Sequence, residues 1–316
     1  MKLQTYLIPL LSVAIIAPVS LQAAPGNISP TPLFVATPTP PNIFFMLDDS
    51  GSMLWNMPAD GISSDALISR TYYDTEPDAR NDEEWFAWCS GANLLAYDSS
   101  VEYTPWVGNI PGTNDPFPDS DDLENVEVDP AKPGDNNITW TDGAENSTVE
   151  GDDSGTVNLS GAPVVTWDDD GDGIYQDREC PNRYNSALVV RADSLPLAEQ
   201  INFANWFSYY RTRTHTVKAA VTQVISGSNA RMGMATLHHT NDVGAAIEDM
   251  TDADKKEALL DNIVSIDPNW RSNTPLRLSL NAVGEYFDKD TNTPDRLNIN
   301  NAPSPILSEA DGGACQ

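Results

Sequence analysis

The sequence predicts an α/β protein in which helices flank a parallel, Rossmann-type sheet, with a long irregular acidic insertion after the first strand. Three observations support this fold class. A short apolar run at 43–47, followed by turn residues, has the length of a buried strand. The segments 197–225 and 275–287 repeat apolar residues every three and four positions, as amphipathic helices do. Between them, 231–237 is a second short apolar run and predicts a second strand.

The charge of the chain excludes some classes of partner. Its 316 residues include 17 Lys and Arg against 47 Asp and Glu, a formal net charge of −30. Nucleic-acid binding depends on Lys and Arg contacts with phosphates, and anionic lipid surfaces attract basic segments. We therefore expect no nucleic-acid partner, whereas cation binding and solubility outside the cell are compatible with this charge.

Residues 1–24 have the features of a secretory signal peptide. Lys2 supplies the positive charge, an apolar stretch follows, and Ala23 and Ala24 offer small residues for cleavage. The apolar stretch is short for a membrane span, and we expect no transmembrane segment after cleavage. Residues 25–41 are rich in Pro and Thr, which predicts an extended linker. We expect the mature protein to be secreted into an oxidising compartment.

The first predicted strand ends in a D-x-S-x-S motif formed by Asp48, Ser50 and Ser52. In open α/β sheets, ligands bind at the carboxyl ends of the strands. A carboxylate and two hydroxyls are hard oxygen ligands that suit Mg²⁺, Ca²⁺ or Mn²⁺, and Gly51 permits the tight turn that brings the hydroxyls together. The motif therefore predicts a divalent-cation site. The alternative is an ordinary Ser/Gly turn after a strand.

Residues 54–196 have no sustained helical period and are rich in Asp, Asn, Gly, Thr and Pro. We therefore interpret them as a long insertion in the first strand-to-helix connection and not as part of the sheet. Loops of this length in compact domains are usually functional or disordered. The aromatic-rich segment 83–103 and the surroundings of Trp167 are expected to be ordered. The segment 116–153 is acidic and poor in large apolar residues, so we expect it to be mobile.

Within the insertion, residues 168–179 match the D-x-D-x-D-G-x5-E pattern of a calcium-binding loop, with Gly173 at its sharp turn. The flanking sequence does not resemble a helix–loop–helix pair, because a strand-like run precedes the loop and Cys180-Pro181 follows it. The pattern predicts a lone calcium loop, with a solvated acidic turn as the alternative. The predicted ligands are Asp168, Asp170, Asp172, the carbonyl of Ile174, Gln176 through a water molecule, and Glu179.

The chain has three cysteines, Cys89, Cys180 and Cys315. An odd number in a secreted protein leaves one cysteine without a partner in the chain. Cys89 and Cys180 flank the same acidic region and form our candidate disulfide. Cys315 would then lack a partner, which is a first indication that the sequence is a fragment of a longer chain.

The second half of the chain is predicted to alternate helices and strands. Residues 197–225 are predicted as a single helix, and 241–250 as a strand at the edge of the sheet. His238 and His239 are expected to lie in a loop without a zinc site, because no Cys or suitably spaced His accompanies them. The predicted core-facing side of the long helix comprises Phe203, Phe207, Tyr210, Thr214, Val217, Val221 and Val224.

Two further helices are predicted after residue 250. The first is expected to begin with Thr251 as its N-cap and to end near Val264. The second is expected to have Thr274 as N-cap and Pro275 as its first residue. Its predicted buried face consists of Leu276, Leu280, Val283 and Phe287.

The motif after the first strand resembles the metal-ion-dependent adhesion site of von Willebrand factor A domains. In that family, a Thr from a later loop and an Asp from the end of a later strand complete the site. By this resemblance Thr274 joins Asp48, Ser50 and Ser52 as a ligand. From the residues alone Thr274 is a helix cap, and it can serve in both roles.

Four segments together resemble a narrower group of proteins. They are NIFFMLDDSGSM, CSGANLLAYDSSVEYTPW, QINFANWFSYYRTRTHTVKAAV and NTPLRLSLNAVGEYF, and a terminal CQ follows them. They are similar to the N-terminal half of type IV pilus tip-associated biogenesis factors of the PilY/PilC type. The resemblance covers residue 42 to the end, and NFANWFSYYRTRT is its most specific part.

This resemblance implies a secreted protein with an N-terminal von Willebrand factor A-like domain and a C-terminal β-propeller. In the family, a Cys near the position of Cys315 leads into a strand that ends in Thr-Asp-Gly, and this Asp completes the metal site. The present sequence stops before such a strand. We therefore expect an incomplete A-like domain over residues 42–316, in a truncated chain.

The leading functional hypothesis is a non-enzymatic one: a secreted, metal-dependent adhesion and assembly module of a type IV pilus, in the periplasm, at the outer membrane or on the pilus. The resemblance implies minor pilins at the pilus tip and host or abiotic surfaces as partners, bound through the cation. The alternatives are an extracellular A-domain scaffold without a pilus role, and a secreted calcium-dependent hydrolase. The hydrolase is disfavoured because Ser50 and Ser52 lack the G-x-S-x-G context of a nucleophile.

Overall fold

The fold is mixed α/β, with small sheets and four α-helices in the part of the chain that the computed structural model describes. The predicted signal peptide, 1–24, and the predicted linker up to residue 39 lie outside this part. None of the described helices has the length and apolarity needed to cross a bilayer. The described residues are 40–54, 90, 93–132, 155–165, 172, 189–238, 243–268, 274–288, 295–299 and 302–306.

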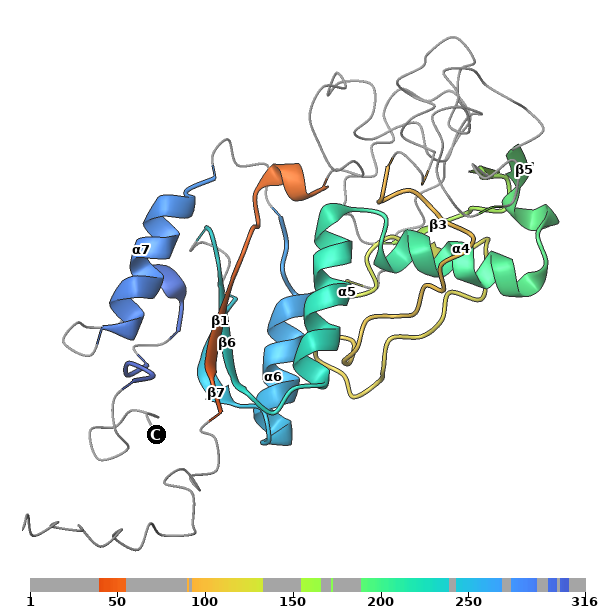
Figure 1. Ribbon diagram of the computed structural model, residues 1–316. Helices are drawn as coiled ribbons and strands as arrows, with labels where there is room; N and C mark the ends of the chain where they lie inside the picture. Colours follow the sequence, from red (N-terminus) through yellow and green to blue (C-terminus); the bar gives the residue numbers. More distant parts are fainter. Residues whose placement is uncertain are drawn as a thin grey trace, which may run out of the picture. The chain divides into compact units, whose positions relative to one another are not determined.

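The main sheet has three strands in the order β1–β6–β7 (Figure 1). β1 (Asn42–Leu47) pairs in parallel with β6 (Arg231–Thr236), and β7 (Gly244–Asp249) runs antiparallel to β6. All three strands lie where the sequence predicted them, and β7 is at the edge. The sheet is nevertheless mixed, not wholly parallel, because the short connection 237–243 cannot provide the crossover that a parallel strand needs.

β1 is less buried than the sequence predicted. All of its residues are half-buried, whereas every residue of β6 is buried. The cause is its position, since β6 lies between two strands and β1 is paired, among the described residues, with β6 alone. Its side chains alternate between the two faces of the sheet, with Phe45 in one apolar cluster and Phe44 in another.

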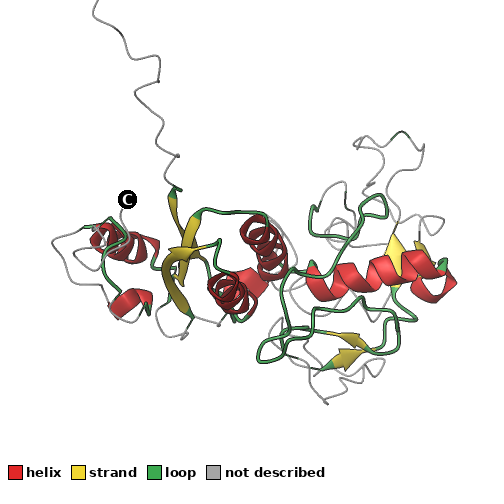
Figure 2. Ribbon diagram, turned by 90° about the horizontal axis from the view of Figure 1, so that it is seen from below, coloured by secondary structure: helices red, strands yellow, loops and turns green. Residues whose placement is uncertain are grey.

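Helices cover both faces of this sheet (Figures 1 and 2). α5 (Arg213–Ser226) and α6 (Ala253–Val264) contribute apolar residues to the cluster that contains Phe45. α7 (Leu276–Phe287) covers the other face, where the ring centroids of Tyr286 and Phe44 are 5.4 Å apart. The end of β1 therefore lies at one edge of a helix–sheet–helix sandwich.

The single helix predicted at 197–225 is in fact two helices, α4 (Leu197–Tyr209) and α5. The chain leaves helical geometry at Tyr210, which has φ −137°. Thr212 then caps α5, because its hydroxyl accepts a hydrogen bond from the His215 amide at 3.2 Å. A Thr side chain that bonds the backbone in this way favours a helix start over a helix interior. Val224, predicted to face the core, is 55% exposed.

The capping residues of the last two helices also differ from the prediction. Asp252, not Thr251, caps α6, and its carboxylate accepts hydrogen bonds from the backbone amides of Asp254 and Lys255. α6 ends at Val264, as predicted. α7 has Pro275 at its N-cap position and no side-chain cap, so Thr274 does not cap this helix.

The buried face of α7 agrees with the prediction only in part, since Val283 and Phe287 pack on the core but Leu276 and Leu280 do not. Ser279 and Tyr286 are buried, whereas Leu276 and Leu280 are 56% and 62% exposed. Two hydrogen bonds explain this orientation: the Ser279 hydroxyl donates to the Leu237 carbonyl at 2.8 Å, and the Tyr286 hydroxyl accepts from the Ile247 amide at 3.0 Å. These polar anchors decide which side of α7 contacts the sheet.

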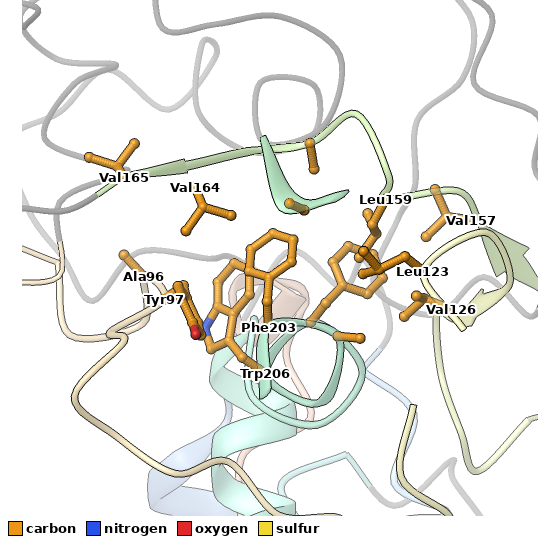
Figure 3. Packing of buried hydrophobic residues seen from close by; sticks show 14 of the residues in the cluster. Ala96, Tyr97, Leu123, Val126, Val157, Leu159, Val164, Val165, Phe203 and Trp206 are labelled. Atoms are coloured by element: carbon orange, nitrogen blue, oxygen red, sulfur yellow. The ribbon is translucent and has the colours of Figure 1, made fainter. Parts of the chain in front are cut away.

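A second apolar core lies between α4 and the predicted insertion (Figure 3). Two antiparallel pairs accompany it, β2 (Val126–Glu127) with β3 (Thr156–Val157), and β4 (Pro163–Val165) with β5 (Val189–Arg191). The expectation that 116–153 is mobile is wrong for 116–132, which contributes buried apolar side chains to the cores. They are Phe117, Leu123, Val126 and Val128.

The polar residues of α4 bind the irregular backbone of the insertion. Asn202 accepts from the Tyr103 amide at 2.7 Å and donates to the Val101 carbonyl at 2.8 Å. Asn205 accepts from the Ser120 amide and donates to the Tyr103 carbonyl. Backbone groups outside regular ladders need such partners when they are buried. The NFANWFSYY segment therefore serves as the support of the insertion.

Glu127 of β2 provides a pH-dependent prediction. Burial, and secondarily the charge of Asp129, raises the pKa of Glu127 to about 7 from an ordinary value of 4.5. The folded state therefore binds this proton more tightly than the unfolded state, and the resulting stability is present below pH 4.5 and lost as the pH rises through 7. We expect Glu127→Gln to raise the melting temperature by a few degrees at pH 8 and to change it little at pH 4.5.

Differential scanning calorimetry at the two pH values checks this expectation. The control is Glu124→Gln, because Glu124 is exposed and lies on the same segment. An equal change in melting temperature at both pH values for Glu127→Gln would contradict the prediction.

Candidate metal site

The D-x-S-x-S loop leaves the carboxyl end of β1 and turns at once into a short 3-10 helix, η1 (Gly51–Leu54). Asp48 Oδ1 accepts a hydrogen bond from the Ser50 amide at 2.8 Å, and the Met53 amide donates to the Ser50 carbonyl at 2.9 Å. These local bonds fold the loop back on itself. The hydroxyl oxygens of Ser50 and Ser52 consequently lie 3.1 Å apart.

This arrangement has the dimensions that a small divalent cation requires. Two oxygens in adjacent positions of an octahedral Mg²⁺ site, each about 2.1 Å from the ion, are roughly 3 Å apart. The spacing of the Ser50 and Ser52 hydroxyls, 3.1 Å, matches this value. Asp48 uses Oδ1 to hold the loop, which leaves Oδ2 for a ligand. The donor set is one carboxylate and two hydroxyls, which fits a hard cation.

The start of α7, which follows Thr274 by two residues, lies at the end of the sheet where β1 leads into η1 (Figure 1). Leu237 links the two regions, because its amide donates to the Leu47 carbonyl and its carbonyl accepts from Ser279 of α7. The Thr274 side chain is exposed and makes no hydrogen bond to the described side chains of the D-x-S-x-S loop. The structure thus brings Ser50 and Ser52 together but does not join Thr274 to them.

Asp49, the residue between the first two motif positions, points into the protein interior. It is completely buried, and its Oδ1 accepts hydrogen bonds from the His238 amide at 3.0 Å and from His238 Nδ1 at 2.7 Å. His238 lies in a bend after β6, as expected of a loop residue, but its contact with Asp49 was not predicted. The signal for this contact was the predicted parallel pairing, because residues that follow two adjacent parallel strands meet at one edge.

A second hydrogen bond holds the far end of the loop. Thr214, in the first turn of α5, donates from its hydroxyl to the Met53 carbonyl at 2.9 Å. The loop is therefore attached to the end of β6 through Asp49 and to α5 through Met53. Among the described residues, no group of three His, Cys, Asp or Glu side chains could hold a metal ion, so hydroxyl oxygens are required for a site at this loop.

Most of the predicted calcium loop lies outside the described residues. Both cysteines of the candidate disulfide, Cys89 and Cys180, also lie outside the described residues. Asp172 is described, and it is exposed. The calcium loop and the disulfide therefore stay predictions. The predicted calcium ligands outside the described residues are Asp168, Asp170, Ile174, Gln176 and Glu179.

Comparison with curated proteins supports a relationship of this chain to type IV pilus biogenesis factors. Over 221 residues the chain is 26% identical to the type IV pilus biogenesis factor PilY1 of Pseudomonas aeruginosa strain UCBPP-PA14, in an alignment that covers 64% of this chain and 16% of that protein. Over 296 residues it is 25% identical to PilY1 of strain PAK, with 84% and 22% covered.

The chain therefore spans about a fifth of the length of the curated relatives that it matches. No protein-family model matches the chain. No solved structure matches it either.

Proposed function

We propose that this protein is a secreted, metal-dependent adhesion and assembly module of a type IV pilus, built on a von Willebrand factor A-like domain. One observation carries the proposal: the hydroxyls of Ser50 and Ser52 lie 3.1 Å apart beside Asp48, at the carboxyl end of a parallel strand. The similarity to two PilY1 proteins supports the pilus part of the proposal.

The sheet supports the A-like part of the proposal. A parallel pair of strands with helices on both faces, and an oxygen-rich loop after the first strand, is what the resemblance implied. The half-burial of β1, whose sequence is the apolar NIFFML, favours an additional strand beside it, outside the described residues. Such a strand would cover apolar area that the described residues leave half-exposed.

In this proposal Asp48, Ser50, Ser52 and Thr274 hold the divalent cation, Mg²⁺ or Ca²⁺. When bound, the cation supplies a positive centre that an anionic group of a partner can coordinate. These side chains would hold the ion, and a partner's carboxylate would coordinate it as a further ligand. The proposed partners are minor pilins of the tip, and ligands on host or abiotic surfaces. We also propose that the predicted calcium-binding loop, residues 168–179, binds a Ca²⁺ ion.

Replacement of Asp48 by Ala tests the site. Because it removes the carboxylate ligand, we expect the affinity for Mg²⁺ or Mn²⁺ to fall by more than about 100-fold, while the melting temperature without metal changes little. Isothermal titration calorimetry measures the affinity, and binding to immobilised minor pilins with and without Mg²⁺ measures the functional consequence. Cation-dependent pilin binding that is unchanged in Asp48→Ala would exclude the proposed mechanism.

The chain provides a matched control for this experiment. Asp98 forms the same local turn in the insertion, with its Oδ1 accepting from the Ser100 amide at 2.9 Å and from the Ser100 hydroxyl at 2.7 Å. This turn is not at the end of a sheet strand. We expect Asp98→Ala to leave both the cation affinity and the cation-dependent binding at wild-type values.

The hydrolase alternative has no supporting contact at this loop. A Ser nucleophile requires its hydroxyl within hydrogen-bond distance of a general base. The Ser50 and Ser52 hydroxyls are bonded to each other, and neither makes a hydrogen bond to His238 in the described part of the chain.

A further inference from the structure

We propose that Asp49 and His238 form a buried latch that positions the D-x-S-x-S loop for its cation, so that His238 is a positioning residue of the metal site. This inference rests on the proposed function of the loop as a cation site. The two residues are 189 positions apart in the sequence and meet at the carboxyl edge of the sheet.

The latch consists of one carboxylate oxygen and two donors of a single residue. Asp49 Oδ1 accepts from both the amide and the Nδ1 of His238, at 3.0 Å and 2.7 Å. Asp49 is 0% exposed and His238 is 6% exposed. A buried carboxylate is costly unless its hydrogen bonds are satisfied, so the loop conformation that keeps both bonds is strongly favoured.

The His238 side of the latch is itself held in place. The carbonyl of His238 accepts a hydrogen bond from the hydroxyl of Thr236 at 2.9 Å. The preceding residue, Leu237, has its carbonyl bound by the side chains of Ser279 and Arg296, at 2.8 Å and 3.0 Å. His238 therefore belongs to a part of the structure that is fixed from several directions, and it provides a stable anchor for the loop.

The latch affects the proposed metal site because its residue Asp49 directly follows the proposed ligand Asp48 in the sequence. Asp48 faces the loop and Asp49 faces the interior, so that anchoring the Asp49 carboxylate also determines the backbone direction at Asp48 and Ser50. If the anchor is lost, all the ligands remain, but the loop samples other conformations. The cation must then order the loop on binding, and this ordering lowers the observed affinity.

His238→Ala in the full chain removes the Nδ1 donor and tests the latch. We expect the Mg²⁺ or Mn²⁺ affinity to fall about 10- to 100-fold, as it does when residues that support metal ligands are removed. In the metal-free protein, we expect faster amide hydrogen exchange at residues 48–53. His238→Asn places an amide donor close to the position of Nδ1, and it should restore the affinity to within a few-fold of wild type.

The control for general destabilisation is Tyr286→Phe, which removes a buried hydrogen bond to the Ile247 amide on another part of the sheet. It should lower the melting temperature without changing the cation affinity. If His238→Ala does not fold, Thr236→Val, which removes the bond to the His238 carbonyl, should still weaken cation binding several-fold and accelerate exchange at 48–53.

The outcomes separate the latch from the proposed function. If the wild-type protein binds Mg²⁺ or Mn²⁺ but His238→Ala and Thr236→Val bind it equally well and exchange equally slowly at 48–53, the latch is wrong and the cation site stands. If the wild-type protein binds none of Mg²⁺, Ca²⁺ and Mn²⁺ at this loop, the proposed function is wrong, and the latch as a feature of the metal site is wrong with it.

Discussion

Replacing Lys218 by Met is expected to lower the free energy of unfolding by about 3–5 kcal/mol, because it leaves the buried carboxylate of Asp129 without its counter-charge. Lys218 Nζ lies 3.7 Å from Asp129 Oδ2, and the two residues are 1% and 2% exposed. Burial lowers the pKa of Lys218, and the nearby carboxylate of Asp129 opposes this shift only in part. Urea unfolding followed by circular dichroism at pH 7 measures the loss.

A double variant separates the charge effect from the loss of packing. Asp129→Asn combined with Lys218→Met removes both charges, and the Asn side-chain oxygen can still accept the hydrogen bond that the Ala131 amide donates to Asp129. We expect it to recover most of the stability lost in Lys218→Met. Equal losses in the single and double variants would show that the ion pair is not the cause.

An exposed ion pair provides the reference for this experiment. Lys255 and Glu248 are 3.3 Å apart, and their side chains are about half exposed. Because solvent screens such a pair, Lys255→Met should cost less than about 1 kcal/mol. The buried ion pair also bears on the candidate site. Lys218 of α5 is paired with Asp129 of the insertion, and Thr214 of the same helix donates a hydrogen bond to the Met53 carbonyl in the D-x-S-x-S loop.

Trp206→Ala is the second substitution with a large expected effect, a loss of about 3–5 kcal/mol. Trp206 is 1% exposed and stacks on Phe203 with ring centroids 5.5 Å apart, as the close-up of this core shows (Figure 3). Its Nε1 also donates to the Leu95 carbonyl at 2.9 Å. The substitution therefore leaves a cavity in the second core and removes the partner of a backbone group in the insertion.

Urea unfolding measures this loss, and limited proteolysis within 93–132 reports whether the insertion separates from α4. Trp206→Phe retains a ring but loses the hydrogen bond, so its loss should be smaller. The control is Val224→Ala, an exposed position on α5, which should change stability by no more than about 0.5 kcal/mol. A loss below about 1 kcal/mol for Trp206→Ala would contradict the importance assigned to this core.

The sequence predicted the strands of the main sheet and the end of α6 because these features depend on short-range patterns. Apolar runs bounded by turn residues are enough to locate strands such as β1 and β6. The folded-back shape of the D-x-S-x-S loop is also local, since the bond from the Ser50 amide to Asp48 spans only two residues. Such bonds form whatever the rest of the chain does.

The spacing of apolar residues gave wrong predictions where polar side chains form hydrogen bonds that determine how a helix begins or which side it buries. The helix break before Thr212 depends on a hydroxyl-to-backbone bond that apolar spacing does not report. The face of α7 was predicted correctly for Val283 and Phe287 but not for Leu276 and Leu280, because Ser279 and Tyr286 bind backbone groups of Leu237 and Ile247. The ordered segment 116–132 was missed because its few apolar residues are enough to pack on α4 once its backbone is hydrogen-bonded.

For the candidate site, the sequence by itself predicted the candidate ligands of the loop, Asp48, Ser50 and Ser52, and determined their position after a strand. Only the tertiary structure decided that Asp49 turns inward to His238 and that Thr214 holds Met53. The physical reason is that these partners are far apart along the chain and are brought together by the pairing of β1 with β6 and the packing of α5. Composition and spacing describe a residue's own neighbourhood, whereas a buried carboxylate and its donor are selected by the whole fold.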